Sequence, residues 1–101
     1  MENKEWIDIG DVAKKLQLRA ESVLKDWFPN GKKLGNEFLV GSLNGESGQS
    51  LRINLDSGMW MDFATTTDKG GDLVSLYAAK EKITNPAAAK FLASEYGIRV
   101  K

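Results

Sequence analysis

Apolar side chains recur every three or four positions over residues 8–28, which is the spacing of one face of a helix. They are Ile9, Val12, Ala13, Leu16, Val23, Leu24, Trp27 and Phe28. Asp8 precedes the first of them and is suited to cap a helix through its carboxylate. Pro29 ends the pattern, because proline cannot continue the hydrogen-bond ladder of a helix. We therefore expect an N-terminal helical segment over residues 1–30, formed by one helix or by two that divide near residues 17–19.

The spacing changes to an alternation of two in the middle of the chain. Residues 50–55 place three aliphatic side chains on one side and three polar ones on the other. The Asp-Ser-Gly turn at 56–58 predicts a hairpin that leads into a strand over 59–63. Another strand is expected at 37–40, and residues 64–71 are expected to form a polar loop.

Helical spacing returns after the paired glycines at 70–71. Asp72 is a second candidate N-cap, Pro86 is expected at the first position of a further helix, and Gly97 is a helix stop. The segments together predict an α+β fold, in which helices at both ends flank a three-stranded antiparallel meander with room for further strands. We expect one compact domain, with residues 31–101 as its core and residues 1–30 as an added helical segment.

The composition excludes several classes of site. The 101 residues include no Cys and no His, which excludes disulfides, a thiolate nucleophile, a Cys–His zinc site and an imidazole base. The apolar runs are too short to cross a bilayer, and the charged residues of 1–5 are unlike the start of a signal peptide. We therefore expect a cytoplasmic, non-enzymatic protein with no membrane partner and no small-molecule substrate.

Charge is distributed unevenly although the formal net charge is zero. Residues 1–33 carry seven basic and six acidic side chains, residues 34–72 carry two and six, and residues 73–101 carry five and two. The predicted sheet therefore lies in an acidic segment. This weighs against nucleic-acid binding there, because clustered Lys and Arg side chains drive phosphate binding.

The order of short motifs over residues 31–100 resembles the N-terminal zinc-ribbon domain of bacterial and phage primases. The matching segments are Gly31-Lys32-Lys33, Glu37-Phe38, Gly41 to Asn44, Glu46, Ser50 to Ile53, Trp60, Asp62 to Thr65, Lys69 to Val74 and Glu95 to Ile98. Residues 60–65, followed by Gly-Gly-Asp-Leu, also resemble the start of large phage or prophage primase–helicase proteins. The resemblance implies a zinc-ribbon-like sheet in a DNA-replication protein.

The zinc-ligand positions of that family fall on Gly41, Asn44, Asp62 and Thr65. These residue types do not form a zinc shell, which needs several thiolate or imidazole ligands. The chain thus resembles a zinc-less relative, for which we expect no cofactor, and apolar burial has to replace the folding energy of the metal. The aromatic residues available for that core are Trp27, Phe28, Phe38, Trp60, Phe63, Tyr77, Phe91 and Tyr96.

Five residues are candidates for contact with nucleic acid: Lys32, Lys33, Arg52, Trp60 and Lys69. The resemblance implies a nucleic-acid-facing sheet around Arg52 and Trp60, and arginine beside an aromatic ring suits stacking and phosphate contact. The three lysines are expected in loops near glycine, where the backbone can approach a phosphate closely. In the simpler alternative, Trp60 belongs to the core, Arg52 lies on a solvated face, and the lysines only aid solubility.

Two further groups have simple structural explanations. The helix start after Gly71 favours anions through its free N–H groups, but Asp72 would repel a phosphate and is explained as a cap. The acidic residues of the middle segment match no magnesium-binding loop, and turns and caps account for three of them. These residues are Glu46, Asp56, Asp62, Asp68 and Asp72.

The function expected from the resemblance is non-catalytic. The domain would hold template DNA, expected to be single-stranded, for the catalytic region of a primase or helicase of a phage, prophage or similar element. An alternative from a different class is a metal-free protein-interaction module that docks onto the replication machinery.

Overall fold

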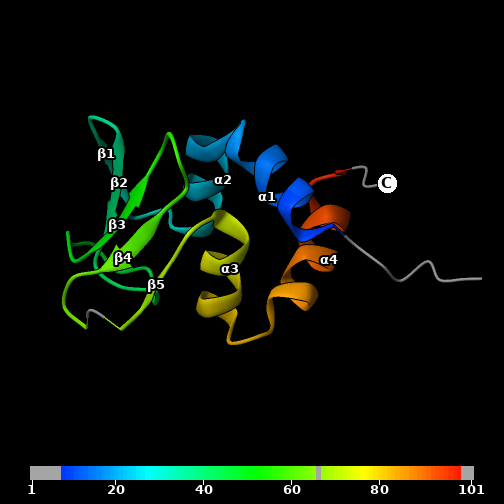
Figure 1. The fold of residues 1–101 in the computed structure, drawn as a ribbon. Helices are drawn as coiled ribbons and strands as arrows, with labels where there is room; N and C mark the ends of the chain where they lie inside the picture. Colours follow the sequence, from blue (N-terminus) through cyan, green and yellow to red (C-terminus); the bar gives the residue numbers. More distant parts are fainter. Residues whose placement is uncertain (1–7, 66, 99–101) are drawn as a thin grey trace, which may run out of the picture.

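The computed structural model describes residues 8–65 and 67–98, which contain four helices and one five-stranded sheet (Figure 1). The elements in chain order are α1 (Ile9–Gln17), α2 (Ala20–Trp27), β1 (Lys32–Leu34), β2 (Glu37–Val40), β3 (Leu51–Asn54), β4 (Trp60–Asp62), β5 (Lys69–Gly70), α3 (Leu73–Glu81) and α4 (Asn85–Glu95). The predicted α+β class, a sheet flanked by helices, is confirmed. Across the described residues, every helix is too short or too polar to cross a membrane.

Each strand pairs antiparallel with its neighbour in sequence, so the order across the sheet is β1-β2-β3-β4-β5. Two rows of residues that pair across β2, β3 and β4 are Phe38, Ile53, Trp60 and Val40, Leu51, Asp62. Their side chains share one face of the sheet, because residues two apart on a strand point the same way. The row between them therefore points to the opposite face.

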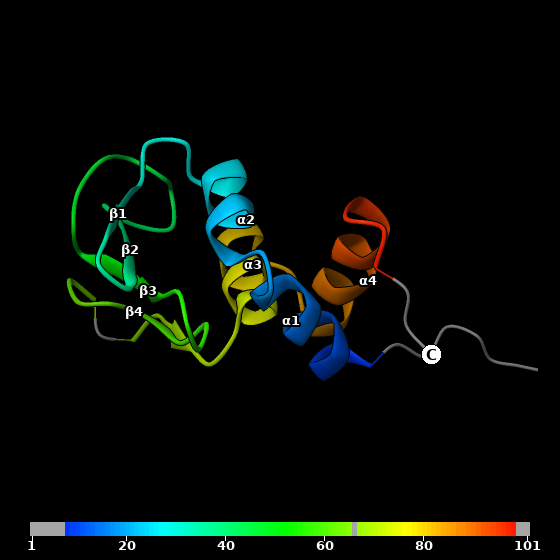
Figure 2. The same cartoon turned by 90° about the horizontal axis from the view of Figure 1, so that it is seen from above.

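The helices lie on one side of the sheet in two layers. α2 and α3 lie nearest the strands, and α1 and α4 lie beyond them (Figures 1 and 2). One hydrophobic core joins the two strand rows to apolar side chains from all four helices. Phe28 and Phe38 are fully buried in it, and burying one such ring contributes about 1.5–3 kcal/mol.

The helix ends follow the local sequence signals. The carboxylate of Asp8 accepts the Asp11 N–H at 3.1 Å, so it caps α1 as predicted. Asp72 accepts the Ser75 N–H at 2.8 Å, and the Ser75 hydroxyl lies 3.4 Å from the Asp72 N–H, which completes a capping box for α3. Gly97 follows α4 with φ +63°, as expected of a helix stop. The N-cap of α4 is Thr84, so Pro86 is the second residue of the helix and not the first, as the sequence had predicted.

Two sequence-based expectations are wrong. Residues 32–33 and Lys69 lie in the edge strands β1 and β5 and not in loops. These strands are two or three residues long and carry exposed or half-buried side chains, so they lack the apolar alternation that marks a strand. The second error concerns the core: Phe63 and Phe91 are 57% and 47% exposed, so neither belongs to it.

Candidate nucleic-acid interface

One face of the sheet carries no helix from the described parts of the chain. We call it the open face, and the strand register assigns to it Lys32, Leu34, Glu37, Leu39, Arg52, Asn54, Met61 and Lys69. Met59 and Phe63 flank β4 and join this face, because Met59 is hydrogen-bonded to Asn54 and the ring of Phe63 lies beside Arg52. The assignment follows from the strand register, because residues that pair across an antiparallel sheet point to the same side. Segment 47–49 lies over part of this face, beside a hollow of about 140 Å³ that Lys32 and Leu39 line.

A single row of the open face crosses all five strands. Lys32 pairs with Leu39, Leu39 with Arg52, Arg52 with Met61, and Met61 with Lys69. Three of the five residues are cationic, and they stand on the first, third and fifth strands. Strands lie about 4.8 Å apart, which separates successive cations by about 10 Å at their backbones. The register thus turns three lysine and arginine residues, distant in sequence, into one line of positive charge.

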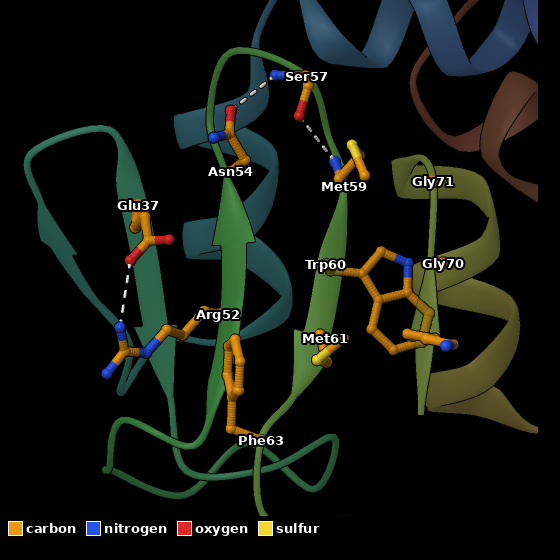
Figure 3. Close-up of a pocket in the computed structure, with 11 residues that line it drawn as sticks. Glu37, Arg52, Asn54, Ser57, Met59, Trp60, Met61, Phe63, Gly70 and Gly71 are labelled. Carbon is orange, nitrogen blue, oxygen red and sulfur yellow. Dashed lines mark hydrogen bonds and ion pairs between the residues drawn. The ribbon is translucent and has the colours of Figure 1, made fainter. Parts of the chain in front are cut away.

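A hollow of about 570 Å³ occupies the middle of the open face (Figure 3). Met59, Met61 and Phe63 give it apolar walls, and the backbone of 70–71 closes one side. Arg52, Glu37 and Lys69 supply the charges. The hollow therefore combines a flat exposed ring, flexible thioether side chains and cations, which suits a planar organic group with nearby negative charge.

Arg52 is held in place by three different contacts. Its Nε donates to the carbonyl of Gln49 at 3.2 Å, and its Nη1 lies 3.7 Å from Oε1 of Glu37. Its guanidinium carbon lies 5.4 Å from the ring centre of Phe63, a cation–π geometry. Figure 3 shows the arginine between the carboxylate and the ring. The side chain remains exposed, so its other N–H groups can still donate to a ligand.

Of the six acidic side chains of residues 34–72, only one lines the hollow of the open face. Asp62 is 2% exposed on the covered face, and its carboxylate accepts the Ala64 N–H at 2.9 Å. Asp72 caps α3, and Asp56 accepts from the Asn36 amide at the end of a hairpin. Glu37 is the one carboxylate among the residues that line the hollow. The acidity of residues 34–72 therefore says little about the charge of this surface.

The structure brings together three of the five predicted binding residues and separates the other two. Lys32, Arg52 and Lys69 share the row described above. Lys33 points to the covered face, where its Nζ lies 3.9 Å from Oε1 of Glu21 in α2. Trp60 lines the hollow but is only 5% exposed, and its indole N–H donates to the Ser75 hydroxyl at 3.0 Å. Its ring packs against the covered side of the sheet.

The sequence interpretation missed Phe63, which is the exposed ring beside Arg52. The signal was present in the alternation of the strand after the turn. If Trp60 pairs with Ile53, as it does, it must join the core face, and Phe63 must face the other way. Choosing that pairing required the turn centre to lie between residues 56 and 57, and a shift by one residue would reverse both assignments.

Gly41, Asn44, Asp62 and Thr65, the positions expected from the resemblance to correspond to zinc ligands, lie in two hydrogen-bonded segments. Around Gly41 and Asn44, two hydrogen bonds hold the chain in a turn. The Gly41 N–H donates to the Glu46 carbonyl at 2.7 Å, and the Gly45 N–H donates to the Ser42 carbonyl at 3.0 Å. Around Asp62 and Thr65, the Thr65 N–H donates to the Asp62 carbonyl at 3.2 Å. Among the described residues, no three His, Cys, Asp or Glu side chains form a metal-binding group. Both segments are therefore closed by their own backbone hydrogen bonds.

Comparisons with protein families, with curated protein sequences and with solved structures find no match to this chain.

Proposed function

We propose that the chain is a non-catalytic domain that binds single-stranded DNA through its open face. The observation that carries the proposal is the row of Lys32, Arg52 and Lys69 across five strands, with the exposed ring of Phe63 beside the central cation. Proteins that hold single strands without reading their sequence combine backbone-tracking cations with stacking rings. The fold supplies both on one surface.

In the proposed complex the strand runs across the sheet, from β1 towards β5. Its phosphates contact the three cations, and one base enters the hollow and stacks on Phe63. The apolar side chains of Met59 and Met61 form the walls around that base. Glu37 holds Arg52 in position, and its carboxylate keeps a second phosphate away from the central cation.

The place of the domain in a larger protein rests on the resemblance to primase zinc ribbons. We propose that it belongs to a cytoplasmic primase or primase–helicase of a phage or prophage, where it delivers template DNA to the catalytic region. Hydrogen-bonded turns replace the zinc knuckles in this proposal, so that DNA binding needs no metal. The binding experiment below tests the domain itself and does not depend on the identity of the larger protein.

The test is fluorescence anisotropy with a labelled oligothymidine at a series of salt concentrations. We expect affinity that falls as salt rises, with a logarithmic slope near −2 for three phosphate contacts at about 0.7 each. Arg52→Ala should weaken binding at least fivefold, about 1 kcal/mol or more. Arg19→Ala is the matched control, because Arg19 also lies over an aromatic ring, that of Tyr96 at 5.6 Å, but does not line the hollow of the open face.

One observation favours a second function, a protein-interaction module. Leu34, Met59 and Phe63 are exposed apolar side chains of the open face, and such groups are common at protein interfaces. In that case the oligonucleotide would not bind even at low ionic strength. Arg52→Ala would then leave every nucleic-acid measurement unchanged, whereas Phe63→Ala would weaken capture of the partner.

A further inference from the structure

A second hollow, of about 390 Å³, lies at the ends of three helices and shares no lining residue with the open face. We call it the aromatic hollow. Four of its lining residues are the aromatic residues Trp27, Tyr77, Phe91 and Tyr96, and three are the charged residues Asp26, Lys80 and Glu95. α2 contributes from its last turn, α3 from its last two turns, and α4 from its last turns and its C-cap.

The rings of the aromatic hollow form a continuous group. Trp27 and Tyr77 have ring centres 4.9 Å apart at an angle of 51°, and Tyr77 and Phe91 are stacked at 5.6 Å and 8°. Trp27 and Tyr77 are half-buried, whereas Phe91 is 47% exposed. The faces of such rings carry partial negative charge, so an exposed face attracts a cation.

The charges around these rings favour the same kind of ligand. Asp26 and Glu95 are exposed residues of the lining, and α2 and α4 both end here, which adds the partial negative charge of two helix C-termini. Burial first, and then the nearby carboxylates of Glu81 and Glu95, raise the pKa of Tyr77. Burial and the hydrogen bond to Asp26 raise the pKa of Tyr96. Burial is the largest cause of both shifts, and the nearby carboxylates add to it.

Lys80 is the opposing charge in the lining, but its Nζ lies 2.6 Å from a carboxylate oxygen of Glu81. The hollow already contacts cations from the chain itself. The Lys80 Nζ lies 5.6 Å from the ring centre of Tyr77, and the guanidinium of Arg19 lies 5.6 Å from that of Tyr96 while donating to its carbonyl. These contacts show the geometry in which the rings accept positive groups.

We propose that the aromatic hollow binds an arginine side chain of a protein partner. The guanidinium would stack on the exposed face of Phe91 and donate to Glu95 or to Asp26, whose Oδ2 accepts from the Tyr96 hydroxyl at 3.1 Å. Arginine fits better than lysine because its flat fork stacks and donates at the same time. Nucleic acid is disfavoured, since two exposed carboxylates of the lining repel phosphate. The domain then has an anion-binding face and a separate cation-binding hollow, with which it can join DNA to a basic protein segment.

The test is an NMR titration of the ¹⁵N-labelled full chain with a blocked Gly-Gly-Arg-Gly-Gly peptide and its citrulline analogue. Citrulline keeps the shape of arginine but has no charge. We expect saturable chemical-shift changes at the Trp27 indole N–H and at residues 91–96. The citrulline peptide should bind about tenfold more weakly than the arginine peptide. Equal binding of both peptides, or shifts only elsewhere, would overturn the proposal.

Two variants test the contributions of the ring and of the carboxylate separately. Phe91→Leu keeps an apolar side chain but loses the ring, and we expect it to weaken binding of the arginine peptide about fivefold. Glu95→Gln keeps the size of the side chain but loses its charge, and it should weaken binding of the arginine peptide by a similar factor. Phe63→Leu on the open face is the matched control and should leave the affinity for the arginine peptide unchanged. If oligothymidine shifts the same signals and the arginine peptide does not, the hollow binds a nucleobase and the proposal is wrong.

Discussion

The open face and the aromatic hollow each present one exposed phenylalanine, yet their surroundings are opposite in charge. Phe63 stands on a sheet, where the register aligns three cations and the carboxylates of neighbouring segments turn away. Phe91 stands among helix ends, where two carboxylates and the C-terminal carbonyls gather. The comparison teaches that secondary structure decides what an exposed ring can bind, because it decides which charges accompany the ring.

The largest expected effect is on the stability of the fold and comes from the buried Trp60. Trp60→Ala should lower the free energy of unfolding by about 3–5 kcal/mol, because it empties a core position and leaves the Ser75 hydroxyl without its indole donor. Urea denaturation measures this, with Trp27→Ala, at a half-buried position, as the milder comparison. Unchanged stability together with lost DNA affinity would place Trp60 on the binding surface instead.

A smaller effect, on oligothymidine affinity, is expected for one of two lysines that lie on opposite faces of the sheet. Lys69→Ala should weaken oligothymidine binding severalfold and reduce the logarithmic salt slope by about 0.7, the value of one phosphate contact with a single strand. Lys33→Ala should leave both quantities unchanged, since Lys33 faces α2 and Glu21. Anisotropy at several salt concentrations gives both numbers. Equal effects of the two variants would mean that binding reflects total charge and not the row.

The raised pKa values of the two tyrosines in the aromatic hollow, caused first by burial and then by nearby carboxylates, predict a dependence of stability on alkaline pH. The chain has two tyrosines, Tyr77 and Tyr96, and both have a raised pKa in the folded state. The unfolded chain therefore loses these protons first, so the free energy of unfolding should fall as the pH rises through about 10. Near-ultraviolet absorbance follows the same two phenols directly. Glu95→Gln should lower their midpoint, and an unchanged midpoint would show that burial alone raises it.

The smallest expected effect is none at all. A metal chelator should leave the thermal midpoint and the oligothymidine affinity unchanged, because hydrogen-bonded turns close the segments around Gly41 and Asp62, where the proposed resemblance would put zinc. A scanning fluorescence measurement with and without chelator tests this. A chelator-induced shift of the midpoint would show that the chain holds a structural metal.

The sequence predicted those features that depend on neighbouring residues. Caps and stops at Asp8, Asp72 and Gly97 are set within one helical turn, and the structure has all three. Features that depend on register were harder. The choice between Trp60 and Phe63 as the exposed ring depends on a turn centre that the Asp-Ser-Gly sequence leaves open by one residue.

Two other features depend on contacts between distant segments. The edge strands β1 and β5 exist because β2 and β4 offer them pairing partners, and their own side chains carry no strand pattern. The aromatic hollow brings together residues of α2, α3 and α4, which are up to 70 positions apart. No local signal identifies such a cluster, and the aromatic residues there were expected in the core.

The central claim is that single-stranded DNA binds to the open face and not to the helical side. It is tested most directly by measuring oligothymidine affinity at low salt for Phe63→Ala and Phe91→Ala side by side. The account predicts that Phe63→Ala weakens binding about five- to thirtyfold, or 1–2 kcal/mol, while Phe91→Ala matches the unmodified chain. Equal affinities for all three proteins, or no binding at low ionic strength, would contradict it.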